Sequence, residues 1–414
     1  MADYDIVIAG AGMVGVSTAL WAQMRGHRVL LADPNPPGSG TSSGNACTLA
    51  TYACIPVNDP SVFWTLPSLL FGKNSPLSVS YTHALRNPRW MASFLANCTP
   101  RRSQQIAAHL AQLLGHADAG LNPLITEAGA EDLVISNGQL SIWSTEAGAN
   151  AAQGGLALRE NLGIALQHLT PHEAESLEPN IDVAIQRAVF YPEARHLADP
   201  EALIRRMQAR FTALGGQTIT AKLTAARDTG SDVAATIGPD TVTARHIVIA
   251  SGAFSRRISG AGTARLPLGT ERGYHLIFAQ DGHRISRPVG WGEGGFYAVP
   301  MAKGLRIAGT VEIAALGAPA NPDRLAYLER RARQMFCDLP PPDSHWLGYR
   351  PTMPDSLPVI GHSPVSKRII HAFGHQHLGL TLGGITGRIV TDLAEGRQPN
   401  IDLQPYRPDR SYIG

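Results

Sequence analysis

Three glycines near the N-terminus have the spacing of a loop that binds a pyrophosphate. Gly10, Gly12 and Gly15 directly follow a short apolar run at 5–9, and apolar residues then recur at helical spacing. In such a loop the first glycine permits the tight turn, the second lets the pyrophosphate approach the backbone, and the third lets helix and strand pack closely. Because the glycines lie between a predicted strand and a predicted helix, the sequence predicts a βαβ unit that binds a dinucleotide.

An acidic residue follows at the place where this unit needs one. Asp33 ends the second apolar run, 28–32, and can accept hydrogen bonds from the hydroxyls of an adenosine ribose. A carboxylate there disfavours the additional phosphate of NADP, so NAD and FAD both fit the unit. The alternative is a glycine-rich turn in an ordinary α/β protein, and the three glycines together with Asp33 argue against it.

Two further glycine segments are predicted to approach the same ligand. Gly252 follows the apolar run 246–250, as Gly10 follows the first strand. Near the C-terminus the loop 374–379 leads into an apolar stripe at helical spacing, and a glycine loop before a helix is a candidate anion site. We therefore expect three distant parts of the chain to meet at one dinucleotide.

The composition argues against several other classes of protein. Lys and Arg total 35 and Asp and Glu total 33, and this net charge of +2 gives no long-range field for binding nucleic acid. Four scattered cysteines match neither a disulfide framework nor a zinc motif, and no spacing of histidines and acids indicates a metal site. The uncharged run 6–24 follows Asp3 and Asp5 and is divided by glycines, so we expect a cytoplasmic protein without a signal peptide or membrane span.

The elements that must position these residues alternate along the chain. Asp199 is the predicted N-cap of a helix, and three strand-like runs follow between 217 and 250. Aromatic and β-branched runs separated by glycine turns indicate an antiparallel sheet over 267–311. Residues 87–130 and 322–337 have helical patterns and are predicted to cover that sheet. The expected fold class is α/β, with an α+β second part.

Six motifs in their order along the chain resemble the FAD-dependent D-amino-acid oxidase superfamily, above all its D-amino-acid dehydrogenase and glycine oxidase branch. They are 10–33, 40–46, 266–274, 309–312, 348–355 and 374–387. The resemblance implies FAD rather than NAD. Some relatives bind flavin through a cysteine just ahead of the fifth motif, where this chain has Trp346, so it implies a non-covalent cofactor.

The resemblance also implies two domains. One is a Rossmann-like, discontinuous FAD-binding domain, and the other is a mostly antiparallel substrate-binding domain. We expect the first to comprise 1–85, 155–260 and 345–414, and the second to comprise 86–154 and 261–344.

The resemblance assigns the cofactor contacts residue by residue. The first glycine loop would hold the pyrophosphate, Asp33 the ribose, and the segment 41–46 the ribityl chain and the isoalloxazine. Gly252 would lie near the adenine, and the loop 374–379 with the start of its helix would face the pyrimidine end of the flavin, where helix N–H groups stabilise negative charge. The expected contacts are Gly10, Gly12, Met13, Val14, Gly15, Asp33, Thr41, Ser42, Ser43, Gly44, Asn45, Ala46, Gly252, Gly374, His375, Leu378, Gly379, Leu380 and Thr381.

Arg350 is the expected binding group for a substrate carboxylate. The resemblance places an arginine there, and a guanidinium pairs with a carboxylate through two parallel hydrogen bonds. Pairing with Asp355 is the alternative. The hydroxyl of Tyr274 is a second candidate for the carboxylate, although packing in a sheet would also explain a tyrosine, and alternation then turns His275 to the opposite face. His377 and His375 flank the flavin loop, and a role is expected for His377 in the pocket.

These residues imply oxidation of an amino acid, most simply a D-amino acid, by hydride transfer from Cα to the flavin. The imino acid would then hydrolyse to a keto acid and ammonia. No strong base is required if the amine binds neutral, and the sequence has no Ser/His/Asp or paired-carboxylate signature. The alternatives are oxidation of a secondary amine such as proline, hydroxyproline or sarcosine, and a flavin-binding protein without turnover. A disulfide reductase would need a CxxxxC pair, and Cys47 and Cys54, seven positions apart, do not provide one.

The resemblance leaves the electron acceptor open. Oxygen, a quinone and a redox protein are all compatible, and a quinone would bring the protein into peripheral contact with the inner face of the plasma membrane.

Overall fold

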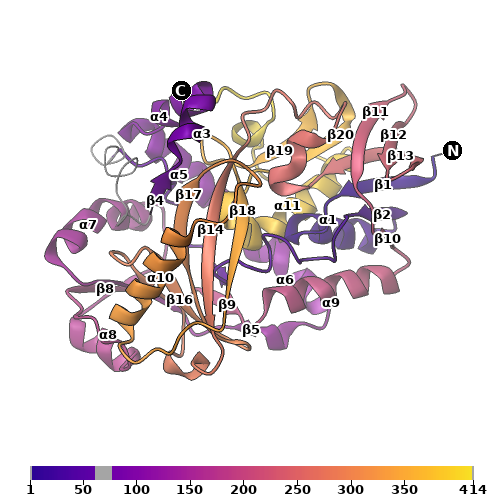
Figure 1. The fold of residues 1–414 in the computed structure, drawn as a ribbon. Helices are drawn as coiled ribbons and strands as arrows, with labels where there is room; N and C mark the ends of the chain where they lie inside the picture. The colour runs from indigo at the N-terminus through magenta and orange to yellow at the C-terminus, as the bar shows by residue number, and fades with distance from the viewer. Residues whose placement is uncertain (1, 61–76, 413–414) are drawn as a thin grey trace.

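The structure, a computed structural model, describes residues 2–60 and 77–412 and contains two large sheets with helices packed on them (Figure 1). The first sheet is built around β1, which pairs in parallel with β2 and β13. Buried parallel strands need apolar residues on both faces, as the run at 5–9 provides. The strands of this sheet are β1 (Tyr4–Ala9), β2 (Val29–Ala32), β10 (Gln217–Ile219), β11 (Leu223–Asp228), β12 (Val233–Ile237), β13 (Asp240–Ile249), β19 (Val359–Ser363) and β20 (Ser366–Phe373).

The second sheet is mostly antiparallel and contains the strands predicted within 267–311. Strand β14 lies next to the edge strand β18 and pairs with β17 on its other side. The strands of the second sheet are β4 (Leu77–Val79), β6 (Gln139–Trp143), β7 (Gln167–Leu169), β8 (Arg187–Tyr191), β14 (Gly269–Phe278), β15 (Val289–Trp291), β16 (Phe296–Met301), β17 (Gly304–Ile313) and β18 (Ser344–Thr352). A small third sheet joins β3 (Thr48–Leu49), β5 (Val134–Ile135) and β9 (Arg195–Leu197).

Helices cover both large sheets. They are α1 (Met13–Met24), α3 (Tyr81–Arg86), α4 (Pro88–Ala96), α5 (Pro100–Leu114), α6 (Ala117–Glu127), α7 (Glu146–Asn161), α8 (Pro171–Leu177), α9 (Pro200–Ala213), α10 (Pro322–Met335) and α11 (Gly379–Ala394). Asp199 caps α9 as predicted, because its carboxylate accepts hydrogen bonds from two backbone N–H groups of the first turn, each at 3.0 Å. The run 6–24 is divided into β1, a turn and α1.

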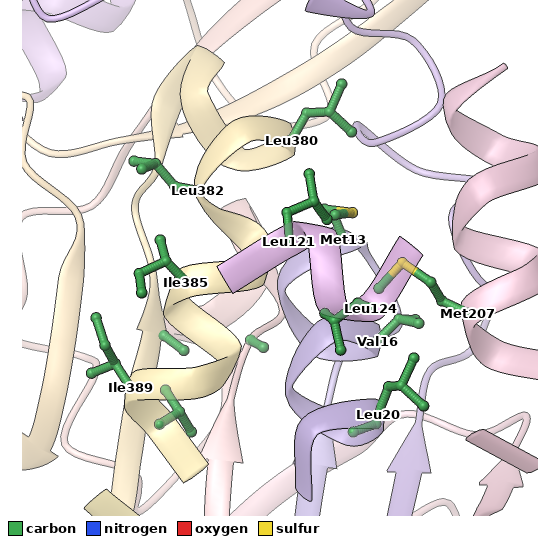
Figure 2. Close-up of a cluster of buried hydrophobic side chains, with 14 of the residues drawn as sticks. Met13, Val16, Leu20, Leu121, Leu124, Met207, Leu380, Leu382, Ile385 and Ile389 are labelled. Atoms are coloured by element: carbon green, nitrogen blue, oxygen red, sulfur yellow. The ribbon is translucent and has the colours of Figure 1, made fainter. Parts of the chain in front are cut away.

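The largest core lies where α1, α6, α9 and α11 meet beside the first sheet (Figure 2). Met13, Val16 and Leu20 project from α1, and their neighbours come from the other three helices. The indole N–H of Trp21 donates to the carbonyls of Gly120 and Gly384, at 3.0 and 3.1 Å, and thereby ties α1 to α6 and α11. This packing fixes the N-termini of α1 and α11 relative to each other.

The predicted division of the chain differs from this arrangement in several places. Helices α5 and α6 pack in the core of the first sheet, although 86–154 were assigned to the second part. Strands β7 and β8 belong to the second sheet, although 155–260 were assigned to the first, and β18 does as well. An amphipathic pattern shows that a helix has a buried face, but it does not show which sheet that face covers.

Candidate active site

Residues from both large sheets line a cavity of about 610 Å³. The turn after β1 and the segment 41–46 form one part of its wall. The other part comes from β14, β17 and β18 together with the turn before α11. The cavity therefore joins the predicted dinucleotide loops to the predicted substrate residues.

The loop after β1 has the geometry that the three glycines predict. A Cβ atom on Gly15 would lie 1.8 Å from the carbonyl oxygen of Gly10, so only glycine lets α1 start this close to the strand. The two carboxylate oxygens of Asp33 accept hydrogen bonds from the backbone N–H groups of Ala11 and Asn35, each at 2.8 Å. Asp33 thus holds the loop in shape as well as lining the cavity.

Two helix N-termini border the same cavity. Gly12 precedes α1 and Leu378 precedes α11, and neither residue caps its helix with a side chain. The first turns of both helices contribute lining residues, Met13 and Val14 from α1 and Gly379 and Leu380 from α11. Two helix N-termini at one elongated cavity suit an anionic dinucleotide, so the residues present fit FAD.

Most of the predicted cofactor residues line this cavity, and five do not. The lining residues among them are Gly10, Gly12, Met13, Val14, Asp33, Thr41, Ser42, Gly44, Asn45, Ala46, Gly252, His375, Gly379 and Leu380. Gly15 packs on Gly10, and Gly374, with φ +87°, forms the turn after β20. Ser43 donates its hydroxyl to the carbonyl of Gly40 at 2.9 Å, and Leu378 lies in the core. Thr381 accepts a hydrogen bond from the N–H of Ala50 at 2.9 Å. These five support the wall from behind.

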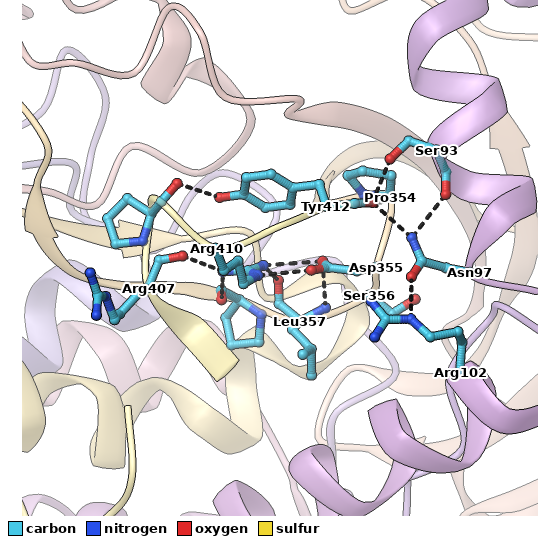
Figure 3. Close-up of polar contacts among 12 residues, drawn as sticks. Ser93, Asn97, Arg102, Pro354, Asp355, Ser356, Leu357, Arg407, Arg410 and Tyr412 are labelled. Carbon is cyan, nitrogen blue, oxygen red and sulfur yellow. Dashed lines mark hydrogen bonds and ion pairs between the residues drawn. The ribbon is translucent and has the colours of Figure 1, made fainter. Parts of the chain in front are cut away.

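Arg350, on β18, lines the cavity with its guanidinium lying over Gly273 of β14. Its Nη1 donates to the carbonyl oxygen of Thr310 at 3.3 Å. The alternative pairing with Asp355 does not occur, because Arg410 binds that carboxylate through two hydrogen bonds of 2.8 and 3.1 Å (Figure 3). Among the described residues no carboxylate forms an ion pair with Arg350, so its guanidinium is available to a bound carboxylate.

A β-bulge turns backbone toward Arg350. The register between β14 and β17 shifts at Arg272/Tyr274, and Thr310 on β17 has φ 56°. This left-handed conformation is costly for a β-branched residue, and such strain concentrates at functional sites. It lets the Thr310 carbonyl accept from the guanidinium, while the Thr310 hydroxyl is buried at the cavity without a hydrogen-bond partner among the described residues.

Glu271 is a cavity residue that the sequence did not single out. It lies opposite Arg350 in the β14–β18 register, and its side chain is 2% exposed. Burial raises the pKa of its carboxyl to about 7, against the opposing effects of Arg350 and Thr352. Alternation along β14 could have identified it, because Glu271 shares a face with Gly273, over which Arg350 lies.

The structure corrects the role predicted for Tyr274. Its ring packs in the core between β14 and α10, on the face of β14 away from the cavity. Its hydroxyl donates to the Glu312 carboxylate at 2.7 Å and accepts from the N–H of Asn321 at 3.0 Å. His275 faces the cavity side instead, where its Nδ1 lies 3.0 Å from the carbonyl oxygen of Gly44 and its ring stacks on Trp346.

The two histidines of the loop before α11 line the cavity and differ in their contacts. The Nε2 atom of His375 lies 2.9 Å from the hydroxyl oxygen of Thr386, and burial lowers the pKa of this histidine to about 3. The side chain of His377 is exposed at the cavity. Desolvation by the surrounding protein, with a smaller effect of Arg350, lowers its pKa to about 4. Both imidazoles are therefore neutral near pH 7, and neither opposes a cationic amine there.

Cys47 and Cys54 do not form a redox pair. Both are free, buried thiols, and burial raises the pKa of each, to about 11 for Cys47. Over 2–60 and 77–412, no cluster of three or more His, Cys, Asp or Glu side chains could hold a metal ion. In the same ranges, no helix has the length and hydropathy to cross a membrane.

A methyl group at Gly273 is expected to displace Arg350 selectively. A Cβ atom there would lie 2.4 Å from Nη2 of Arg350, and the flexible guanidinium would move rather than the backbone. We expect Gly273→Ala to raise KM for the substrate roughly 10-fold, about 1.4 kcal/mol, with little change in Tm. Gly154→Ala on α7, where a Cβ meets no atom within 4 Å, is the control and should leave KM unchanged. Equal KM values in the two variants would contradict the prediction.

The buried carboxyl of Glu271 gives stability a pH dependence of known sign. Its pKa is about 7 in the folded protein and 4.5 in its ordinary state, so between these values the folded chain holds a proton that the unfolded chain has released. The contribution of Glu271 to the free energy of unfolding is therefore complete below pH 4.5, and it is lost as the pH rises through the folded-state pKa of about 7. Glu271→Gln should remove this loss, up to ~1.4 kcal/mol per pH unit, as measured by urea unfolding across the window. An unchanged pH slope would contradict it.

Comparison with known proteins agrees with this geometry. The family described as FAD dependent oxidoreductase (DAO) matches residues 5–393. The D-amino-acid oxidase of Bradyrhizobium diazoefficiens is 34% identical over 98% of each chain, and D-amino acid dehydrogenase 2 of Ralstonia nicotianae is 27% identical over 97% of this chain and 99% of that one. Glycine oxidase from Geobacillus kaustophilus has the same fold, with a TM-score of 0.75 at 22% identity over 100% of both chains. The resemblance found in the sequence is thus confirmed, and the chain belongs to the family of FAD dependent oxidoreductases.

Proposed function

We propose that this chain oxidises a D-amino acid at its Cα–N bond, giving an imino acid that hydrolyses to a keto acid and ammonia. The observation that carries the proposal is Arg350. It lines the cavity of the FAD loops and has no carboxylate partner among the described residues. The D configuration is proposed from the two relatives, whose names specify D-amino acids.

FAD supplies the chemistry by accepting a hydride, and the chain's own residues bind and orient the substrate. Arg350 would pair with the substrate carboxylate and so fix the position of Cα. Ile55, Val57 and Phe296 line the same cavity and would contact the substrate side chain away from water. His377 is proposed to line the pocket as a neutral group. FAD is proposed to bind non-covalently, since Trp346 occupies the stretch where some relatives have a cysteine.

The test is anaerobic reduction of the purified holoenzyme by single compounds. D- and L-enantiomers of each amino acid, glycine, sarcosine, proline and the hydroxyprolines are added in turn, and bleaching of the oxidised-flavin band is recorded. Bleaching by D-amino acids and not by their L-enantiomers is the expected result. Bleaching by secondary amines alone would favour the alternative substrate class, and bleaching by none would overturn the proposal and leave a flavin-binding protein without turnover.

The acceptor is tested with the reduced enzyme. Oxygen, a soluble quinone analogue and an artificial electron carrier are compared by the rate at which each restores the oxidised flavin. Rapid reoxidation by the quinone and slow reoxidation by oxygen would support a dehydrogenase in peripheral contact with the inner face of the plasma membrane. The opposite ratio would make the protein an oxidase.

A further inference from the structure

Arg350 and Glu271 together bring groups of opposite charge to the wall of the cavity. They are opposite each other in the β14–β18 register, and both line the cavity. They form no ion pair with each other among the described residues, and Oε2 of Glu271 has no hydrogen-bond partner there. Buried polar groups in folded proteins are nearly always satisfied, so an unpartnered carboxylate oxygen on a residue that lines a cavity points to a ligand.

Side chains on strained backbone hold Glu271 in place. Gln376 donates from Nε2 to Oε1 of Glu271 at 3.4 Å and to the hydroxyl of Ser356 at 3.2 Å. Ser356 in turn donates to the side-chain carbonyl of Asn58. Gln376 and Ser356 both have positive φ, 50° and 58°, a conformation that non-glycine residues adopt where the surrounding structure requires it. This chain of contacts engages Oε1 of Glu271 and leaves Oε2, at the wall of the cavity, buried without a hydrogen-bond partner among the described residues.

We propose that Glu271 binds the amino nitrogen of the substrate and accepts a proton from its ammonium form. The inference rests on the proposed function and deepens it. An amino acid is a zwitterion whose charges match this pair, with its carboxylate on Arg350 and its ammonium on Glu271. On proton transfer an N–H bond breaks, an O–H bond forms on Glu271, and the electron pair remains on nitrogen as the lone pair of a neutral amine.

Electrostatics at the cavity agree with this role. The pKa of Glu271, about 7, suits a group that takes up and returns a proton near neutral pH. The titratable group that acts on Glu271 is Arg350 from β18. His377, from the loop before α11, lines the same cavity, and its pKa is about 4, so this imidazole is neutral there. Thr352 and Gln376, its other neighbours, do not titrate.

The experiment measures binding to the holoenzyme of two ligands that cannot be oxidised in this way. 2-Aminoisobutyrate has the amino and carboxylate groups but no hydrogen on Cα, and isobutyrate has the carboxylate alone. We expect Glu271→Gln to weaken the binding of 2-aminoisobutyrate at least tenfold, as measured by calorimetry. Isobutyrate should bind to this variant as tightly as to the wild type, or more tightly. Glu271→Asp should restore part of the loss. Glu175→Gln, at an exposed position on α8, is the control.

A second readout follows the proton. Binding of an ammonium lowers the pKa of a carboxyl group, so 2-aminoisobutyrate should release protons from the wild type slightly below pH 7, as calorimetry in two buffers of different ionisation enthalpy records. Glu271→Gln and isobutyrate should show no release. Equal weakening of both ligands, or of neither, would overturn the role of Glu271 even if amino acids bleach the flavin. Failure of the wild type to bind either ligand or to be bleached would overturn the proposed function as well.

Discussion

Replacing Arg350 with alanine is expected to lower kcat/KM by roughly 100- to 1,000-fold, which corresponds to about 3–4 kcal/mol. The guanidinium has one long hydrogen bond, to the carbonyl of Thr310, and no carboxylate partner among the described residues, so its function would be lost with little loss of packing. Most of the effect should fall on KM. Steady-state kinetics with the best substrate from the screen measures it, and the visible spectrum records FAD occupancy.

Two further variants make the Arg350 result specific. Arg350→Lys retains the charge but not the planar pair of donors, so it should recover only part of the lost activity. Arg227→Ala removes an exposed arginine on β11 that does not line the cavity, and should leave kcat/KM unchanged. A kcat/KM of Arg350→Ala within threefold of the wild type would overturn the carboxylate-binding role.

Loss of Arg410 should destabilise the fold more than loss of any surface charge. Its guanidinium pairs with the buried Asp355 carboxylate and donates to the carbonyls of Leu357 and Pro358 at 2.8 and 3.0 Å (Figure 3). The side chains of Arg410 and Asp355 are 8% and 4% exposed, so Arg410→Ala would leave the buried carboxylate of Asp355 without its partner. The expected cost is about 3–5 kcal/mol. Urea unfolding of the holoenzyme measures it as a lower midpoint.

Arg407 offers a matched control in the same segment. It pairs with Asp409, and these side chains are 54% and 48% exposed. Solvent screens such a pair, so Arg407→Ala should leave the urea midpoint nearly unchanged. If the two variants unfolded at the same urea concentration, the Asp355–Arg410 pair would not have the stabilising role inferred here.

The cofactor half of the site could be predicted from sequence because its signals are local. The strand, turn and helix around Gly10 are consecutive in the chain, and each glycine has a defined place relative to the pyrophosphate. Asp33 was likewise found by its distance along the chain. Arg350 was found through the resemblance. That it forms no ion pair with Asp355 was not predictable, because Arg410, which binds the Asp355 carboxylate instead, is 55 positions away in the chain.

The substrate half depends on pairing between strands, which a single sequence does not specify. Tyr274 and His275 were correctly placed on opposite faces, yet which face met the cavity depends on the packing of β14 against α10. Glu271 acquires its environment from β18 and from the loop before α11, both far away in sequence. Helices α5 and α6 were predicted as helices and assigned to the wrong sheet for the same reason.

The contact between α1 and α11 also sets a time at which the protein can first become complete. Trp21 and its acceptor Gly384 are 363 positions apart. At ~5–20 residues per second, a ribosome needs roughly 20–70 s to synthesise that interval. During this period the apolar face of α1 on the nascent chain lacks its partner helix, and the FAD loop after β1 lacks the opposite wall of its cavity. Tight retention of the cofactor therefore requires that α11 has already been synthesised.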